Sequence, residues 1–262
     1  MSLDTLSLWR LVTKREIIMK ITSIIRELYK RKMIVLLVAI VILFAILFKA
    51  GMFGDADTRI RVTCAGDSIT YGSGVLKSKE IDSYPAQLQT RLGTSYLVSN
   101  FGLRNATASP NGDLPYIDSD EYKESLESKP DIVVLMLGTN DAKRFNWDQN
   151  SYEKGLETLV KSYQDLPSKP VVYLMRSPYC FPINESGEME YNINEKVVYF
   201  KLAPSIEKVA EKTGVEVIDL FTITQNKEDL YTDGVHFNVE GYSVISDAVY
   251  DVIKKLDIDK TK

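Results

Sequence analysis

The chain has 262 residues, of which 45% are apolar, 26% charged and 10% aromatic, a composition that excludes wholesale disorder, collagen-like repeats and a disulfide-stapled miniprotein. Its net charge of −4 argues against a nucleic-acid partner bound through phosphate neutralisation. The charge is uneven, because residues 1–32 carry +5 and the remainder −9. Two cysteines, Cys64 and Cys180, are too few for a disulfide framework and could pair only if the fold brings them together.

The first predicted element is a single transmembrane helix. Residues 33–48 are sixteen consecutive apolar side chains that follow a basic segment at 1–32. If Lys49 extends its ammonium to the interface, the span covers 33–53, enough to cross a hydrocarbon core of roughly 30 Å. No Ala-x-Ala cleavage site follows, so we expect an uncleaved signal anchor in a cell membrane, with the N-terminus cytoplasmic and the rest outside the cytoplasm. Met19 is a second possible start of the chain.

A short polar linker at 54–60 leads to one predicted domain at 61–262. Apolar runs predict strands, and apolar side chains at helical spacing predict helices between them. Because helices of this length allow crossover connections, we expect a three-layer α/β/α sandwich around a parallel sheet of about five strands. The predicted strands are 60–65, 96–101, 131–138, 171–175 and 215–220, and the helices are 83–93, 152–163, 193–209 with a kink at Pro204, and 238–256.

Polar motifs follow several of these strands, at the edge where parallel sheets collect functional groups. They are GDSIT at 66–70, NFG at 100–102, GTND at 138–141 and, before the last helix, DGVH at 233–236. Each motif alone is a common turn or loop sequence. Asp67 and Asp141 suit local side-chain to backbone hydrogen bonds that hold the turns.

Three residues in these motifs suit nucleophilic catalysis. A serine hydroxyl needs an adjacent base, and Ser68 stands on a predicted strand-to-helix turn. His236 is the only histidine in the sequence, and Asp233 precedes it at a spacing that lets the carboxylate hold one ring nitrogen. One histidine and no Cys/His cluster disfavour a zinc esterase, and we expect no metal and no cofactor.

Three groups in these motifs could stabilise a developing oxyanion. They are the backbone N–H of Ser68, the N–H of Gly102, which lacks a Cβ that would obstruct a substrate, and the side-chain amide of Asn140.

The ordered blocks GDSIT, NFG, GTND and DGVHFN resemble those of the SGNH, or GDSL, hydrolase superfamily. Ser68, Gly102, Asn140 and His236 match the four residues that give the superfamily its letters, and Asp233 matches the third member of the triad. The resemblance implies a flavodoxin-like fold and metal-independent ester hydrolysis through an acyl-serine. Two departures are Arg104-Asn105, where many relatives have small residues, and Phe237, where many have proline.

The stretches SYPAQLQ, GDLPY, LMLGTNDAKRFNW and LPSKP are similar to bacterial carbohydrate acetylesterases, which implies a short acyl, foremost acetyl, ester on a carbohydrate or cell-envelope glycan. Candidate substrate-binding residues are Arg104, Trp147 and Arg176, with loop 177–192 as the specificity element. Three alternatives stay open at this stage. They are a lipase or lysophospholipase-type esterase, an O-acyltransferase that passes the acyl group to a sugar, and an inactive glycan-binding module.

Overall fold

The computed structural model describes the backbone of residues 3–49, 58–184 and 187–256, and in the first of these ranges the side chains of 19–46. The chain divides into two compact units, residues 1–57 and 58–262. In the first unit one helix, α1, covers Leu3–Lys49.

The membrane span predicted at 33–53 is not found in the structure. No helix among the described residues is long and apolar enough to cross a membrane. The part of the predicted span with described side chains, 33–46, follows three consecutive cations, Lys30, Arg31 and Lys32. The side chains of 47–53 lie outside the described residues.

The second unit is built on a parallel sheet of five strands in the order β2-β1-β3-β4-β5, which confirms the predicted α/β class and is the flavodoxin-like strand order. The central strand β3 is buried along its whole length, because helices cover both faces of the sheet. The strands are β1 (Ile60–Gly66), β2 (Tyr96–Gly102), β3 (Ile132–Met136), β4 (Val171–Arg176) and β5 (Glu216–Asp219).

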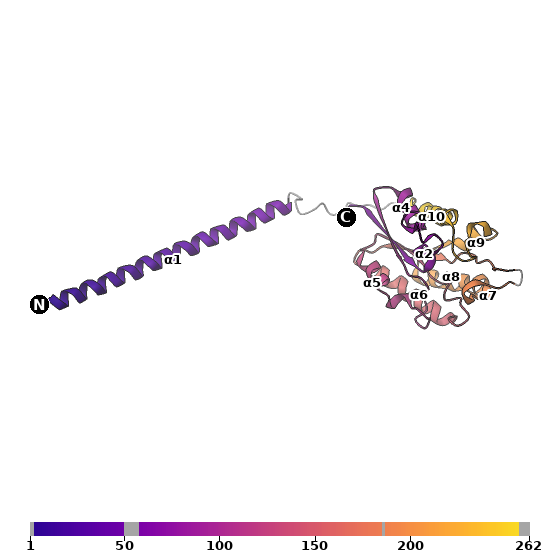
Figure 1. Cartoon of the computed structure of the whole chain (residues 1–262), viewed down its shortest axis with the longest axis horizontal. Helices are drawn as coiled ribbons and strands as arrows, with labels where there is room; N and C mark the ends of the chain where they lie inside the picture. The colour runs from indigo at the N-terminus through magenta and orange to yellow at the C-terminus, as the bar shows by residue number, and fades with distance from the viewer. Residues whose placement is uncertain (1–2, 50–57, 185–186, 257–262) are drawn as a thin grey trace. The chain divides into compact units, whose positions relative to one another are not determined.

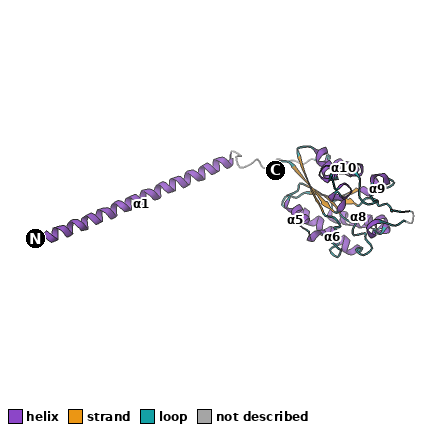
Figure 2. Ribbon diagram, viewed as in Figure 1, coloured by secondary structure: helices purple, strands orange, loops and turns teal. Residues whose placement is uncertain are grey.

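Figures 1 and 2 show the strands between two helical layers, with α4 and α10 on one side and α5, α6 and α8 on the other. The helices of the second unit are α2 (Ser68–Tyr71), α3 (Lys79–Asp82), α4 (Tyr84–Leu92), α5 (Asp120–Glu127), α6 (Gln149–Gln164), α7 (Glu195–Phe200), α8 (Leu202–Thr213), α9 (Leu220–Thr224) and α10 (Val239–Ile253). Short 3-10 turns lie at Ser73–Val75, Tyr116–Asp118, Glu190–Asn192 and Glu228–Leu230.

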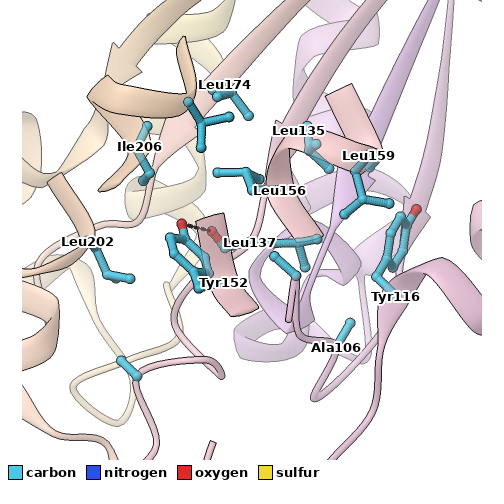
Figure 3. Close-up of a cluster of buried hydrophobic side chains, with 14 of the residues drawn as sticks. Ala106, Tyr116, Leu135, Leu137, Tyr152, Leu156, Leu159, Leu174, Leu202 and Ile206 are labelled. Atoms are coloured by element: carbon cyan, nitrogen blue, oxygen red, sulfur yellow. Dashed lines mark hydrogen bonds between the residues drawn. The ribbon is translucent and has the colours of Figure 1, made fainter. Parts of the chain in front are cut away.

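Two apolar cores lie on opposite faces of the sheet, because alternate side chains of a strand point to opposite faces. Val133 and Leu135 of β3 belong to the core under α6 and α8, whereas Val134 and Met136 belong to the core under α4 and α10. Figure 3 shows the first core, in which the hydroxyl of Tyr152 donates to the carbonyl of Leu137 at 3.1 Å, just beyond β3.

The helix predicted at 193–209 is two helices, and the break differs from the expected one. α7 ends at Phe200 and α8 begins at Leu202, so the interruption lies at Lys201 and not at Pro204. Pro204 is the third residue of α8, where no intrahelical partner is needed for its missing N–H.

Candidate active site

The carboxyl end of β1 carries Ser68 on a tight turn from strand to helix. β1 ends at Gly66, and Asp67 is the N-cap of α2, with its carboxylate accepting a hydrogen bond from the N–H of Ile69 at 3.0 Å. As the first residue of the helix, Ser68 has a backbone N–H without an intrahelical acceptor, and no other described residue accepts it. The turn therefore presents both a hydroxyl and an N–H donor at the edge of the sheet.

Asp233 and His236 lie in the loop before α10, and their positions are fixed by this loop itself. Oδ1 of Asp233 accepts the N–H of Val235 at 3.0 Å and the N–H of His236 at 2.7 Å. Oδ2 of Asp233 lies 2.7 Å from Nδ1 of His236, and Nε2 of the same ring lies 2.9 Å from Oγ of Ser68. The structure thus joins the three residues predicted from the sequence by two consecutive hydrogen bonds.

The charge on Asp233 defines the state of the imidazole. Burial raises the pKa of Asp233, but the hydrogen bonds from the ring and the backbone of His236 outweigh burial and hold this pKa well below its ordinary value. Because an ionised carboxylate can only accept, Nδ1 of a neutral His236 ring carries the proton, and Nε2 is left to accept the hydroxyl of Ser68. The arrangement can take a proton from Ser68 and stabilise the imidazolium that results.

Gly102, a predicted oxyanion donor, does not offer its N–H to the site. That N–H donates to Oδ1 of Asn100 at 2.9 Å. The lack of a side chain serves packing instead, since a Cβ at Gly102 would lie 2.2 Å from the backbone nitrogen of Tyr71. The glycine therefore reflects the close approach of β2 to the end of α2, and the prediction for Gly102 is corrected.

Asn105, and not Gly102, carries the second backbone N–H that is a candidate oxyanion donor. It lines the same pocket as Ser68, Asn140 and His236, and its φ of +67° lies in the left-handed region. No described residue accepts its backbone N–H. Sequence reasoning passed over Asn105 in favour of a glycine, although asparagine is among the non-glycine residues that most readily adopt a left-handed conformation.

Asn140 lines the pocket, as the sequence predicted. Its Nδ2 donates one hydrogen to the carbonyl of Ala106 at 3.2 Å, and the second hydrogen of the amide remains for a ligand. The backbone carbonyl of Asn140 accepts a hydrogen bond from Nδ2 of Asn146 at 2.9 Å, which holds the loop after β3 in place. Three residues that line the pocket therefore carry candidate donors: Ser68 and Asn105 through their backbone N–H groups, and Asn140 through its side-chain amide.

Two buried carboxylates support these loops. Asp67 caps α2 as expected, whereas Asp141 accepts the N–H groups of Ala108 and Ser109 at 3.0 and 2.8 Å, and so holds the distant loop that carries Asn105. Burial raises the pKa of Asp67 to about 7 and that of Asp141 to about 6. Oδ2 of Asp67 is buried without a hydrogen-bond partner among the described residues, which agrees with a carboxyl that is hard to ionise.

A small pocket opens beside Ser68 and His236, with a cavity volume of about 30 Å³. A single water occupies about 10–15 Å³ on this measure, so the space suits a small group. Oγ1 of Thr139 is buried there without a hydrogen-bond partner among the described residues. The lining consists of Ser68, Arg104, Asn105, Thr139, Asn140, Tyr191, Ile193, Val235 and His236.

The structure places only one of the three predicted substrate-binding residues at the pocket. Arg104 lines the pocket and is exposed. Trp147 instead packs on Tyr152, with ring centroids 5.7 Å apart. Arg176 pairs with Asp219 at 3.3 Å and lies over an aromatic ring of α9. Neither Trp147 nor Arg176 lines the pocket, because internal partners hold both side chains elsewhere.

The loop at 177–192 reaches the pocket through Tyr191, which the sequence analysis did not single out. Its hydroxyl donates to Oδ2 of Asp233 at 2.9 Å. The chain has 15 tyrosines, and no local pattern distinguishes this one.

Cys64 and Cys180 are both free and buried, and burial raises the pKa of each thiol to about 12. They belong to the cores on opposite faces of the sheet, which explains why they do not pair. Among the residues with described side chains, no group of three or more His, Cys, Asp or Glu could hold a metal ion.

Comparison with known proteins identifies a family and relatives that are similar in sequence. The model of the GDSL-like lipase/acylhydrolase family matches residues 64–244. An acetylxylan esterase of Xylanibacter ruminicola is 36% identical over 218 residues, which are 76% of this chain and 44% of the relative. The chain therefore spans less than half the length of that curated relative. An uncharacterized protein of Bacillus subtilis, YpmR, is 25% identical over 77% of this chain and 84% of its own length.

Solved structures share the fold at lower identity. A carbohydrate acetylesterase family member from Sinorhizobium meliloti matches with a TM-score of 0.57 and 24% identity, covering 74% of this chain and 97% of that one. An aryl esterase from M. smegmatis matches with a TM-score of 0.61 and 19% identity, covering 75% of this chain and 99% of that one.

Proposed function

Because the chain belongs to the GDSL-like lipase/acylhydrolase family, and so to the carboxylic ester hydrolases, we propose that it cleaves short-chain acyl esters, foremost acetyl esters, on a carbohydrate. The observation that carries the proposal is the row of hydrogen bonds from Asp233 through His236 to Ser68, beside a pocket with space for a small acyl group.

The proposed reaction begins when Oγ of Ser68 attacks the ester carbonyl and Nε2 of His236 takes its proton. The tetrahedral intermediate collapses as His236 returns that proton to the leaving alcohol, and the acyl group remains on Ser68. A water molecule then gives a proton to Nε2 and its oxygen attacks the acyl carbon. His236 protonates Oγ as the bond to Ser68 breaks, which releases the acid. Asp233 stays ionised and stabilises the imidazolium in both halves.

The negative charge on the carbonyl oxygen develops next to the three donors. We propose that the N–H of Ser68, the N–H of Asn105 and the amide of Asn140 stabilise it. Two of these are backbone groups without other acceptors among the described residues, so no existing hydrogen bond has to break for them to bind an oxyanion.

The size of the pocket supports a short acyl group. Its apolar lining is supplied by Ile193 and Val235, and a volume of about 30 Å³ is filled by a group of a few heavy atoms. A long acyl chain exceeds this volume and would have to extend outside the pocket. The relative described as an acetylxylan esterase supports a carbohydrate as the alcohol.

A panel of p-nitrophenyl esters and acetylated oligosaccharides tests the proposal. We expect kcat/KM to fall by at least about tenfold from acetyl to longer acyl chains, and acetate to be released from the sugars. Ser68→Ala removes the activity, whereas Ser95→Ala, at an exposed position before β2, leaves it unchanged. Faster cleavage of long-chain esters would favour a lipase, and no cleavage by a folded chain would favour a binding module.

Acyl transfer to a sugar is separated from hydrolysis by competition. If deacylation limits turnover of a p-nitrophenyl ester, an added sugar acceptor accelerates release of nitrophenol only when it attacks the acyl-serine. Hydrolysis predicts an unchanged rate and no acylated sugar.

We further propose that the apolar segment beginning at residue 33 holds the enzyme at a membrane. This proposal rests on the sequence, in which sixteen apolar residues follow three cations, and not on a span in the described residues. In alkaline carbonate extraction we expect the full chain to stay with the membranes and a chain beginning at Thr58 to be released. Release of the full chain would contradict the attachment.

A further inference from the structure

We infer that Tyr191 is a positioning residue, which shares the carboxylate of Asp233 with His236 and thereby sets how strongly the imidazole holds the proton of Ser68. This inference rests on the roles proposed for Ser68, Asp233 and His236, and adds a fourth side chain that acts through them.

The contacts of Tyr191 point to this role. Its hydroxyl donates to Oδ2 of Asp233 at 2.9 Å, and the same oxygen accepts Nδ1 of His236 at 2.7 Å. Its ring also meets the imidazole edge to face, with centroids 5.3 Å apart and planes at 71°. Tyr191 therefore touches both members of the pair on which the basicity of the site depends.

The hydroxyl remains a donor under all assay conditions. Burial, together with the hydrogen bond to Asp233, raises the pKa of Tyr191 to about 12. With this bond, Asp233 accepts four hydrogen bonds, two at each oxygen, which is about the full capacity of a carboxylate. The negative charge that faces Nδ1 of His236 is thus divided between two donors.

The backbone of Tyr191 is in a conformation that bulky residues rarely adopt, with φ 59° and ψ 23°. The next residue, Asn192, also has a positive φ of 57°. Contacts with the loop that follows β3 hold this turn: Asn192 accepts the N–H of Arg144 at 3.0 Å, and Asn194 donates its N–H to Ala142 at 2.8 Å. A conformation that neighbouring structure must maintain is more often found where a side chain has a functional position.

This geometry links three parts of the site. The segment around Tyr191 is hydrogen-bonded to the loop that carries Asn140, and its side chain is hydrogen-bonded to the loop that carries Asp233 and His236. Tyr191 also lines the pocket and is 45% exposed, so its ring forms part of the pocket wall.

Removal of the hydroxyl gives the test. In Tyr191→Phe the ring stays, while Oδ2 of Asp233 keeps the imidazole as its remaining side-chain donor and stabilises the imidazolium more. We expect the acid limb of the kcat/KM profile to move to higher pH by about half a unit. The plateau of kcat falls about threefold, since a more strongly held proton returns more slowly to Oγ of Ser68 when the acyl-serine is hydrolysed. KM for a p-nitrophenyl acetate changes little because the wall of the pocket is kept.

Tyr199→Phe is the matched control, because its hydroxyl donates to the carbonyl of Cys180 at 2.7 Å and not to the triad. Its pH profile should match that of the wild type. An unmoved acid limb in Tyr191→Phe, an equal shift in Tyr199→Phe, or complete loss of activity in a folded Tyr191→Phe would overturn the inference. Wild-type activity that depends on Ser68 shows in the same assay that the proposed function holds independently.

Discussion

At the scale of single residues, Asn140 offers the proposed substrate a single amide hydrogen. One amide hydrogen is held by the carbonyl of Ala106, and the other is available to the substrate. We expect Asn140→Ala to lower kcat by about 10²-fold with a small change in KM, because this donor acts mainly on the charge of the transition state. Steady-state kinetics with acetyl esters measure the changes in kcat and KM separately. Asn150→Ala, at an exposed position in α6, should leave both constants unchanged.

The carboxylate of Asp233 allows a second residue-scale prediction. In Asp233→Asn an amide can donate to Nδ1 of His236, which moves the ring proton to Nε2 and removes the acceptor for Ser68. We expect kcat to fall by about 10³- to 10⁴-fold while the far-UV spectrum is kept. Asp229→Asn, an exposed neighbour, provides the control. A loss below tenfold in Asp233→Asn would contradict the assigned role.

Asp67 allows a prediction about pH. Burial raises its pKa from the ordinary 3.8 to about 7, so the folded state binds more protons than the unfolded state between about pH 4 and 7. This carboxyl therefore lowers the stability of the fold as pH rises through that range. Asp67→Asn keeps an oxygen for the N–H of Ile69 and removes the titration.

Urea unfolding at pH 5 and pH 8 measures this effect. The free energy of unfolding of Asp67→Asn relative to the wild type should rise by more than about 1 kcal/mol from the lower to the higher pH. A constant difference between the two proteins would show that Asp67 ionises normally in the folded state.

The predicted site residues that the structure brings together are those whose proposed chemistry is intrinsic to the side chain. The sequence contains a single histidine, with an aspartate three residues before it, and a serine on a predicted strand-to-helix turn. These residue types and spacings indicate which side chains can pair. Asn105 and Tyr191 could not be recognised in this way, because their contributions come from a backbone N–H and from a loop contact across the fold. Gly102 misled for the same reason, since its N–H is taken by a neighbouring side chain that the sequence does not locate.

At the scale of elements, α6 supports the loop that carries Asn105. Gly155 lies inside α6, and a Cβ there would be 1.9 Å from the carbonyl oxygen of Ala108. Helix propensity alone predicts that Gly155→Ala stabilises the protein by about 1 kcal/mol. Because this Cβ would clash with backbone, we expect the opposite effect. Gly155→Ala should lower the free energy of unfolding by about 1–3 kcal/mol.

Thermal or urea unfolding checks the prediction for Gly155. Thr158→Ala, at an exposed position of the same helix, is the control and should stabilise slightly, as propensity indicates. If both variants gained stability, the contact between α6 and the loop at 105–109 would be wrong. The reduced activity expected in Gly155→Ala should accompany its reduced stability, since the same loop carries a proposed oxyanion donor.

The elements themselves were predictable to the extent that periodicity determines them. β3 is a continuous apolar run and was recognised as a central strand, and the order of strands and helices implied the parallel sheet. The break between α7 and α8 was not recognised, because a proline within an apolar pattern suggests a kink at its own position. The structure shows that this proline instead belongs to the first turn of a new helix.

At the scale of the whole molecule, every residue of the proposed site lies in the unit at 58–262. β1 begins at Ile60, so a chain that starts at Thr58 retains the complete sheet. We expect this shorter chain to keep kcat/KM for a soluble acetyl ester within about twofold of the full chain. A large loss in the folded shorter chain would show that the first unit contributes to catalysis.

The most direct test of the account is the identity of the acylated residue. The full chain is treated with a fluorophosphonate and digested, and the modified peptide is sequenced by mass spectrometry. We predict one adduct on Ser68, none in Ser68→Ala, and a strongly slowed reaction in His236→Ala. An adduct on another residue, or undiminished ester hydrolysis by Ser68→Ala, would contradict the account.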